Sequence, residues 1–280
     1  MHHAILTNTP PKGGSWAAVG ANGTNIRVAV VAVAERVRIA TGLGLVRVYR
    51  LMDFVFLFSA LIVIYCLLRK WNTVAGAMLG ILLFSLYLPA TMLFFYFHPW
   101  DRPSLLLWAI CVLFAVNNKF GWFLLFFAIG IVVKFDSVIG LILYPVVNWI
   151  NQPKPLLIRK SFAAAIVAVT TIVVLVVMIP GGFDGTNRQM LLSNNIHEML
   201  SFGLFYPPVL VYGLLFGACL VGWKSSGWQM RALFMCGVAM LLPHILFTNF
   251  IEVRAQVGPI LCMLPLAVHG FGSDLTTVAR

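Results

Sequence analysis

Apolar runs long enough to enter a membrane follow one another over most of this chain, separated by short polar connections. Of the 280 residues, 61% are hydrophobic and only 10% are charged, a balance outside the range of soluble domains. A helix needs about 20 residues to cross a bilayer, which leaves little room for a separate soluble domain. The composition therefore predicts an all-α fold, a polytopic bundle of transmembrane helices with about eight or nine membrane segments, some short or broken.

The order of apolar and polar runs divides the chain into three parts. We expect an amino-terminal polar or interfacial segment over residues 1–50, a transmembrane helical domain over 51–270 and a short carboxy-terminal tail over 271–280. Within the second part, the expected apolar runs are residues 51–68, 74–97, 105–116, 121–150, 162–179, 202–221, 232–247 and 257–269. No alternating pattern of the kind found in membrane β-barrels interrupts them.

The run over residues 121–150 contains Lys134 and Asp136 near its middle, which fits either one long tilted helix or two short half-spans. Short cytoplasmic loops carry an excess of Lys and Arg, so the basic loops should all lie on one face. A single crossing here would put Lys119 and Arg159 on opposite faces. A break at Lys134–Asp136, on the outer face, restores the alternation and gives nine segments.

The amino-terminal part fits this pattern poorly. Residues 28–34 are apolar, but Glu35, Arg36 and Arg38 follow at once, so we expect an interfacial helix rather than a crossing. Its basic residues indicate the cytoplasm, and so does the Arg69–Lys70 pair at the far end of the first span. Either the charge bias fails here or an earlier span precedes this sequence.

The five cysteines all lie inside apolar runs, without a Cys-x-x-Cys pair or a neighbouring histidine. This placement predicts small buried side chains rather than disulfides or a zinc site. The chain has no Asp-Asp or Asp-x-Asp motif either, so we expect no metal and no cofactor. The net charge of +11 comes from small basic groups at the ends of spans, which indicates membrane anchoring and not nucleic-acid binding.

The nine-segment arrangement places four polar stretches on the face away from the cytoplasm: residues 98–104, 134–136, 180–201 and 247–256. Charged groups at membrane depth are costly, so a converging set of them indicates a functional site. The alternative is that they only neutralise one another. In that case Asp101 would pair with Arg102 or Arg254, and Lys134 with Asp136 or Glu252.

Two stretches resemble known membrane enzymes. Residues 89–97, then Pro99-Trp100-Asp101-Arg102-Pro103-Ser104, an apolar helix, Lys119, a second apolar helix and Lys134, resemble the middle of GT-C class membrane glycosyltransferases. Asn249-Phe250-Ile251-Glu252-Val253-Arg254, which opens the last span with Pro259 and Pro265, is similar to a Glu-x-Arg feature of related polysaccharide-assembly membrane proteins. The resemblance covers residues 51–269.

The resemblance implies transfer of a sugar from a polyprenyl-phosphate donor to a lipid-linked or protein acceptor. The reaction would take place on the outer face of a bacterial cytoplasmic (inner) membrane, in a multi-pass protein. Asp101 and Glu252 would be the catalytic carboxylates, and the donor phosphate would be bound by Arg102, Lys134, Arg254 and, more weakly, His98. Arginine suits a phosphate because its planar fork bonds two oxygens at once.

One departure from the class concerns its first external loop, which holds a key acidic residue. In this chain no Asp precedes Asp53, and Glu35 is the only acid before it. The resemblance is therefore to a shortened or divergent relative, and no catalytic base is assigned in the first 50 residues. Two other functions stay open: a transporter or flippase of a cell-envelope precursor, and a non-catalytic membrane subunit of a larger complex. Membrane lipid is a partner in each case.

Overall fold

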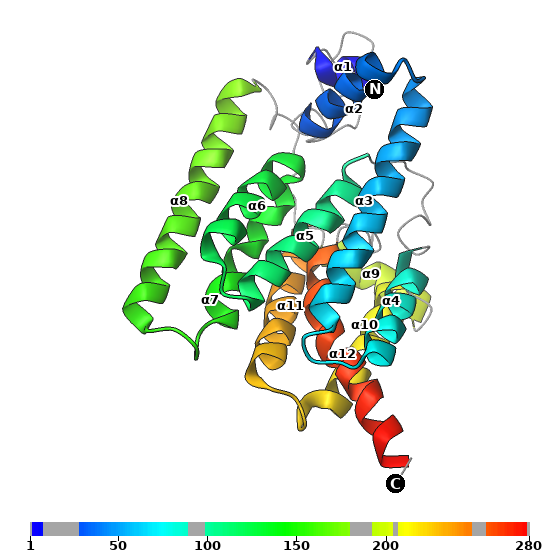
Figure 1. The fold of residues 1–280 in the computed structure, drawn as a ribbon, viewed down its shortest axis with the longest axis vertical. Helices are drawn as coiled ribbons and strands as arrows, with labels where there is room; N and C mark the ends of the chain where they lie inside the picture. Colours follow the sequence, from blue (N-terminus) through cyan, green and yellow to red (C-terminus); the bar gives the residue numbers. More distant parts are fainter. Residues whose placement is uncertain are drawn as a thin grey trace.

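The computed structural model describes residues 2–7, 28–88, 99–179, 192–203, 207–247 and 256–278, and these parts of the chain are helical, without a strand (Figure 1). The all-α prediction is confirmed for them. The helices are α1 (His2–Leu6), α2 (Val28–Thr41), α3 (Leu45–Leu68), α4 (Val74–Tyr87), α5 (Asp101–Val116), α6 (Phe120–Val133), the 3₁₀ helix η4 (Phe135–Ile142), α7 (Leu143–Val147), α8 (Lys154–Met178), α9 (Leu192–Phe202), α10 (Pro207–Trp223), α11 (Trp228–Phe247) and α12 (Val257–Val278).

Three of the described helices are long and apolar enough to cross a membrane: α3, α8 and residues 228–246 of α11. With 24 residues, α3 is about 36 Å long, more than the hydrocarbon thickness of a bilayer. Several other apolar helices are shorter, among them α4, α6, α10 and α12. The helices are thus compatible with an integral membrane protein, although the expected count of eight or nine segments is not established by their lengths.

Two of the long helices begin earlier than the apolar pattern predicts. The first expected span started at residue 51, but α3 starts at Leu45 and includes Arg47 and Arg50, which are both exposed. The span expected from residue 162 starts at Lys154 in α8. Long basic side chains extend their charges toward water while their stems stay on apolar surface, so they do not end a helix at a membrane boundary.

The basic loops meet at one end of the bundle. Lys70, after α3, donates a hydrogen bond to Asn117 Oδ1 after α5, with an Nζ–Oδ1 distance of 2.6 Å. Partial burial lowers the pKa of the Lys70 ammonium. The α10–α11 turn joins the same end, because Gln229 Nε2 donates to the carbonyl oxygen of Val116 at 3.2 Å. These two contacts bring the loops after α3, after α5 and before α11 to the same end of the bundle.

A polar network at this end links the helices of residues 120–160 to one another. The Tyr144 hydroxyl and the Gln152 amide both donate to Asn118 Oδ1, and Lys160 Nζ donates to Gln152 Oε1 at 2.9 Å. Asn118 itself adopts a φ of 57°, in the left-handed region that Asn tolerates better than most residues. The network ties the start of α6 to α7 and α8.

The helix break predicted within residues 121–150 is confirmed. Helix α6 ends at Val133, Lys134 is extended with φ −152° and ψ 107°, and η4 starts at Phe135. Because Tyr144 of α7 bonds to Asn118, which precedes α6, the chain returns to the end where α6 began. A single tilted helix over this run is therefore the wrong alternative.

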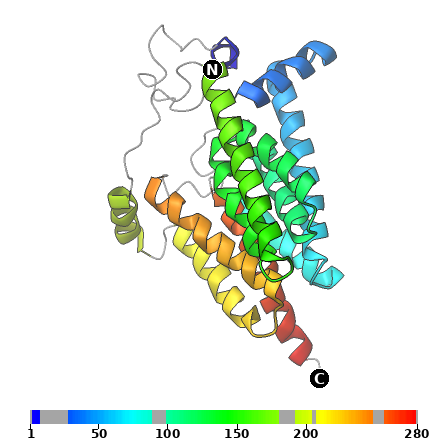
Figure 2. The same cartoon turned by 90° about the vertical axis from the view of Figure 1, so that its left-hand side faces the viewer.

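Helix α2 lies at the opposite end of α3 from the basic loops (Figures 1 and 2). Its buried residues Val30, Val31 and Ala34 pack in a small apolar cluster with residues of α3 and α6, namely Val48, Met52 and Val133, and with Trp100. A helix is present where an interfacial helix was expected, and it extends to Thr41, beyond its charged residues. Within it, the Glu35 carboxylate accepts two hydrogen bonds from Arg38 and raises the pKa of that guanidinium.

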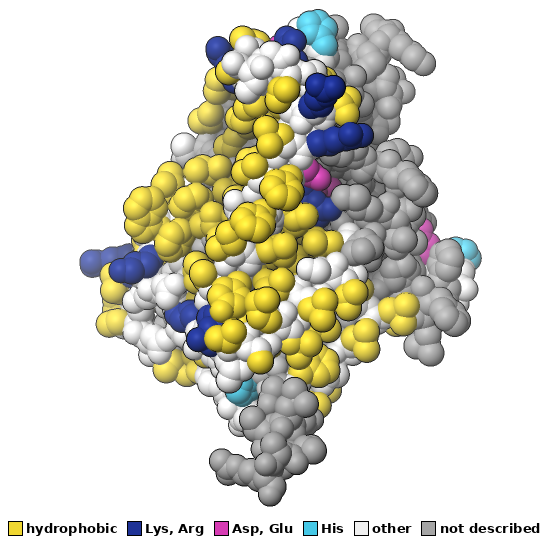
Figure 3. Space-filling view, turned by 45° about the vertical axis from the view of Figure 1, so that its right-hand side comes forward, with side chains coloured by type: hydrophobic (Ala, Val, Ile, Leu, Met, Phe, Trp, Pro, Cys, Tyr) yellow, Lys and Arg dark blue, Asp and Glu magenta, His cyan; other side chains and the backbone are white. Residues whose placement is uncertain are grey.

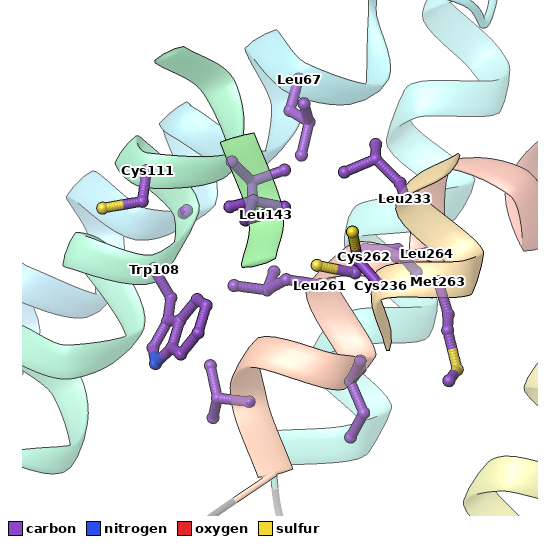
Figure 4. Close-up of a cluster of buried hydrophobic side chains, with 14 of the residues drawn as sticks. Leu67, Trp108, Cys111, Leu143, Leu233, Cys236, Leu261, Cys262, Met263 and Leu264 are labelled. Atoms are coloured by element: carbon purple, nitrogen blue, oxygen red, sulfur yellow. The ribbon is translucent and has the colours of Figure 1, made fainter. Parts of the chain in front are cut away.

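The main apolar core lies around α12, which packs against α10, α11, α4 and α5 (Figure 4). Small residues let α10 and α12 approach closely: a Cβ added at Gly222 would lie 2.8 Å from the carbonyl oxygen of Leu266. All five cysteines are free. Four are buried, as expected, but Cys66 is exposed on α3, so the prediction of burial is wrong for that residue.

Candidate functional site

Five charged side chains from α3, α5 and the α6–η4 junction meet near the end of the bundle opposite the basic loops. We call them the charge cluster: Asp53, Asp101, Arg102, Lys134 and Asp136. Lys134 Nζ lies 3.4 Å from Asp101 Oδ1 and 3.5 Å from Asp136 Oδ2, so it is placed between two carboxylates. Arg102 Nε lies 3.8 Å from Asp53 Oδ2.

The two cations are the most buried members of the charge cluster. Their side chains are each 8% exposed, against 18% for Asp101, 27% for Asp53 and 30% for Asp136. Burying a cation is tolerated only where anionic partners compensate for its lost hydration. The pairing thus explains how Arg102 and Lys134 are held inside an otherwise apolar bundle.

Local structure places these side chains. Asp101 and Arg102 open α5, where a carboxylate in the first turn interacts favourably with the helix dipole. Lys134 is extended between α6 and η4, and its ammonium lies between Asp101 of α5 and Asp136 of η4. Asp53 lies within α3, and its ion pair with Arg102 links α3 to α5.

The ion pairs are longer than charge-assisted hydrogen bonds, which have donor–acceptor distances of about 2.7–2.9 Å. Asp136 Oδ1 and the Ser137 hydroxyl are buried and have no hydrogen-bond partner among the described residues. Two cations at 3.4–3.8 Å from their carboxylates are still able to form shorter bonds to another acceptor. The geometry is that of a charged site with spare hydrogen-bonding capacity.

Two further ionisable side chains flank the charge cluster. Tyr87 of α4 interacts electrostatically with Asp101 and Arg102. His244 of α11, which is 2% exposed, interacts with Asp136 and Lys134. The site therefore contains residues from α3, α4, α5, η4 and α11, which are far apart in the sequence.

The depth of the charge cluster follows from its place on α3. Asp53 lies eight residues after Leu45, about 12 Å along the helix, and fifteen residues before Leu68, about 22 Å. If Leu68 marks the cytoplasmic boundary of an apolar layer about 30 Å thick, Asp53 lies several ångströms inside the outer boundary. At that depth unpaired charges are costly.

An apolar groove borders the charge cluster. Its volume is about 350 Å³, and its lining residues include Met52, Pro103 and Val133. These three are the chain neighbours of Asp53, Arg102 and Lys134. The other lining residues come from α2, α3, α5 and α6: Ala29, Val30, Val33, Phe56, Leu106, Leu107, Ile110, Phe126, Ile129 and Val132.

Basic side chains also gather at this end of the molecule. Arg36 continues the stripe of α2 formed by the groove residues Ala29 and Val33, because positions three and four apart share a helix face. Figure 3 shows several basic side chains near the α1–α2 end, and below them acidic and basic side chains beside a mainly hydrophobic surface. An apolar groove whose lining residues adjoin two buried cations in the chain suits an amphiphile with an anionic head group.

The structure brings together three of the residues singled out from the sequence, Asp101, Arg102 and Lys134. Of the pairs that mutual neutralisation would form, Lys134–Asp136 is present; Asp101 pairs with Lys134 and not with Arg102, and Arg102 pairs with Asp53. The other three predicted site residues, His98, Glu252 and Arg254, lie outside the described residues.

Sequence reasoning did not assign Asp53 to the site, although a signal was present. Asp53 is the only carboxylate in the apolar helix α3, and an acid at that depth indicates a partner or a function. Within the described part of the chain, no group of three His, Cys, Asp or Glu side chains could hold a metal ion. Comparisons with protein-family models, curated proteins and solved structures find no match for this chain.

Proposed function

We propose that this protein is an integral membrane glycosyltransferase that takes a sugar from a polyprenyl-phosphate donor at the membrane face opposite the basic loops. The observation that carries the proposal is that two buried cations, Arg102 and Lys134, directly adjoin in the chain two lining residues of an apolar groove, Pro103 and Val133. A polyprenyl-phosphate has the two parts that such a site would bind, a long hydrocarbon chain and a phosphate.

The cations support the phosphate part of the proposal. In sugar transfer from a lipid phosphate, negative charge develops on the departing phosphate oxygen, and fixed cations stabilise it. Arg102 would offer two parallel N–H groups and Lys134 a point charge. Both are held by carboxylates at 3.4–3.8 Å, so their positions are set before a ligand arrives.

A transferase also needs a carboxylate to accept the proton of the acceptor hydroxyl. Asp101 is our candidate, with Glu252 as the second, as the resemblance implies. Asp101 is partly exposed and lies at the first turn of α5 beside Lys134. The charge cluster holds one more carboxylate than cations, so one carboxylate is available for this role without leaving a cation unpaired.

We also propose that the bundle has nine membrane segments and lies in a bacterial cytoplasmic membrane. The segments would be α3, α4, α5, α6, η4 with α7, α8, α10, α11 and α12. This order alternates the loops so that Arg69, Lys119, Lys154 and Lys224 share the cytoplasmic face. The donor and acceptor would then meet on the outer face, where lipid-linked sugars are used.

The first test is binding of a polyprenyl-phosphate to the purified protein in lipid nanodiscs. Replacing Arg102 with Gln should weaken binding by about 10- to 100-fold, since a hydrogen bond to a charged group contributes about 1.5–3 kcal/mol. Arg159→Gln is the matched control, because Arg159 is exposed at the basic end of α8. Incubation with a polyprenyl-phosphate sugar labelled in the sugar, followed by analysis of the lipid and protein fractions, then tests the transfer.

A transporter of a lipid-linked precursor is the second candidate, supported by the helix break at Lys134. Broken helices that carry charged residues at membrane depth form substrate sites in many transporters. Binding without sugar transfer, together with movement of the lipid between leaflets of a proteoliposome, would favour this candidate. Failure of the wild-type protein to bind the lipid phosphate would refute both.

A further inference from the structure

The indole of Trp108 fills the space between two glycines. Trp108 projects from α5 toward α12 and is 7% exposed (Figure 4). A Cβ added at Gly140 of η4 would lie 2.9 Å from its Cη2 atom, and one added at Gly258 of α12 would lie 2.9 Å from Cε2 and Cζ2. Both distances are shorter than non-bonded carbon contacts of about 3.5–4.0 Å. Only glycine leaves room for the ring on both sides.

Helix α5 contacts the segment from Lys134 to Gly140 at two levels. At the outer level, Lys134 Nζ lies 3.4 Å from Asp101 Oδ1. At the inner level, Trp108 lies against Gly140. Asp101 and Trp108 are seven residues apart on one face of α5, an axial distance of about 10.5 Å.

The segment from Lys134 to Gly140 covers a similar axial distance between the same two levels. From Lys134 to Gly140 there are six residues, about 12 Å at the 2.0 Å rise of a 3₁₀ helix. The two contacts are thus spaced alike on α5 and on η4, to within about 2 Å. One axial register of η4 along α5 therefore satisfies both contacts.

We infer that Trp108 is a positioning residue, whose ring holds η4 in the register that places Lys134 between Asp101 and Asp136. A 3₁₀ helix has poor hydrogen-bond geometry and depends on packing for its stability. The Ser137 hydroxyl makes no hydrogen bond to the described residues, so it does not anchor the segment. Gly258 closes the other side of the indole and keeps the ring against Gly140.

The inferred register does not depend on any ligand, but its consequence for binding rests on the proposed function. If the charge cluster binds a lipid phosphate, a shift of η4 would move Lys134 relative to Arg102 on α5. The two cations would then no longer reach the same phosphate. Trp108 would thereby affect affinity without touching the ligand.

The test compares Gly140→Ala, Trp108→Phe and the double variant in nanodiscs, with Gly121→Ala as control. A Cβ at Gly121 meets no atom within 4 Å. The readout is the rate at which a water-soluble N-hydroxysuccinimide ester acetylates Lys134, followed by mass spectrometry. This rate reports the placement of the buried amine and requires no ligand.

Gly140→Ala should raise the acetylation rate of Lys134 by about fivefold or more, the factor that corresponds to about 1 kcal/mol in the exposure equilibrium. The double variant should return toward the wild-type rate, because phenylalanine lacks the outer indole atoms that the new Cβ meets. A general loss of stability would not be relieved by making the core smaller. Gly258→Ala presses on the ring from the other side and should act in the same direction, which provides a second variant if Gly140→Ala fails to fold.

Polyprenyl-phosphate affinity of the same variants forms a separate arm. If the wild-type protein binds no lipid phosphate but Lys134 reactivity follows the expected pattern, the proposed function fails and the positioning role stands. If the wild-type binds, Gly140→Ala should weaken binding and the double variant should restore it. Unchanged Lys134 reactivity in folded Gly140→Ala and Gly258→Ala, or a double variant as reactive as Gly140→Ala alone, would overturn the inference.

Discussion

Replacing Asp53 with Asn should destabilise the protein more than replacing Asp136 with Asn, although both changes remove one carboxylate from the charge cluster. Arg102 has its ion pair with Asp53, whereas Lys134 has two carboxylate partners, Asp101 and Asp136. Asp53→Asn therefore leaves a guanidinium that is 8% exposed without its anion. Asp136→Asn leaves Lys134 paired with Asp101 at 3.4 Å.

The magnitude follows from the separations and the exposures. Two unit charges about 4 Å apart attract by about 4 kcal/mol at an effective dielectric constant of 20. Asp53 is 27% exposed, so part of that energy is screened by solvent. We expect Asp53→Asn to lower the free energy of unfolding by about 2 kcal/mol and Asp136→Asn by less than about 1 kcal/mol.

Reversible unfolding in bicelles gives both free energies. The double variant Asp53→Asn/Arg102→Gln should recover part of the loss, because it removes the unpaired cation together with its partner. Equal losses for Asp53→Asn and Asp136→Asn would refute the reasoning, since the two carboxylates would then contribute alike. A larger loss for Asp136→Asn would mean that Lys134 depends on Asp136 and not on Asp101.

Three further changes test other parts of the fold. Gly270→Ala in α12 should cost about 1–3 kcal/mol, because its Cβ would lie 2.9 Å from the amide nitrogen of Gly222 on α10, whereas Gly213→Ala, where a Cβ meets no atom within 4 Å, should cost little. Tyr144→Phe should cost about 1–3 kcal/mol, because the buried Gln152 amide loses the Tyr144 hydroxyl as a hydrogen-bond acceptor, and Tyr65→Phe is its control. Both series are measured by unfolding in bicelles. In intact cells, a membrane-impermeant maleimide should label Arg50→Cys and leave Arg69→Cys unlabelled until the membrane is opened; the reverse result would place the basic loops outside.

The helix break and the grouping of the basic loops could be predicted because both depend on charge patterns that act locally along the chain. Lys134 and Asp136 interrupt 30 apolar residues, and the positive-inside rule needs only loop composition. The helix starts at Leu45 and Lys154 could not be predicted in this way, because basic side chains remain compatible with a helix at the membrane boundary.

The pairing inside the charge cluster could not be predicted from the sequence either. Asp101 and Arg102 are neighbours, so the sequence suggested that they pair with each other. In the structure, the packing of α3 against α5 and the position of Lys134 between α6 and η4 decide which carboxylate faces which cation. This axial register comes from buried contacts such as Trp108 with Gly140, and no local pattern encodes it.

The balance of carboxylates and cations in the charge cluster offers a way to determine whether its ligand is an anion or a cation. Three carboxylates face two cations, so an anionic ligand is repelled by the excess carboxylate, which in a transferase is retained for proton transfer. Asp136→Asn makes the numbers equal and leaves both Arg102 and Lys134 with a partner. It should therefore tighten binding of a polyprenyl-phosphate in nanodiscs by about fivefold to tenfold, which corresponds to about 1 kcal/mol of removed repulsion. The same change should weaken the binding of a cationic ligand or of a proton, the kind of ligand that a transporter coupled to a cation would bind. Tighter phosphate binding by Asp136→Asn and weaker binding by Arg102→Gln would together identify an anion held by the two cations. Weaker binding in both variants would show that Asp136 itself contacts the ligand, and would contradict this account of the site.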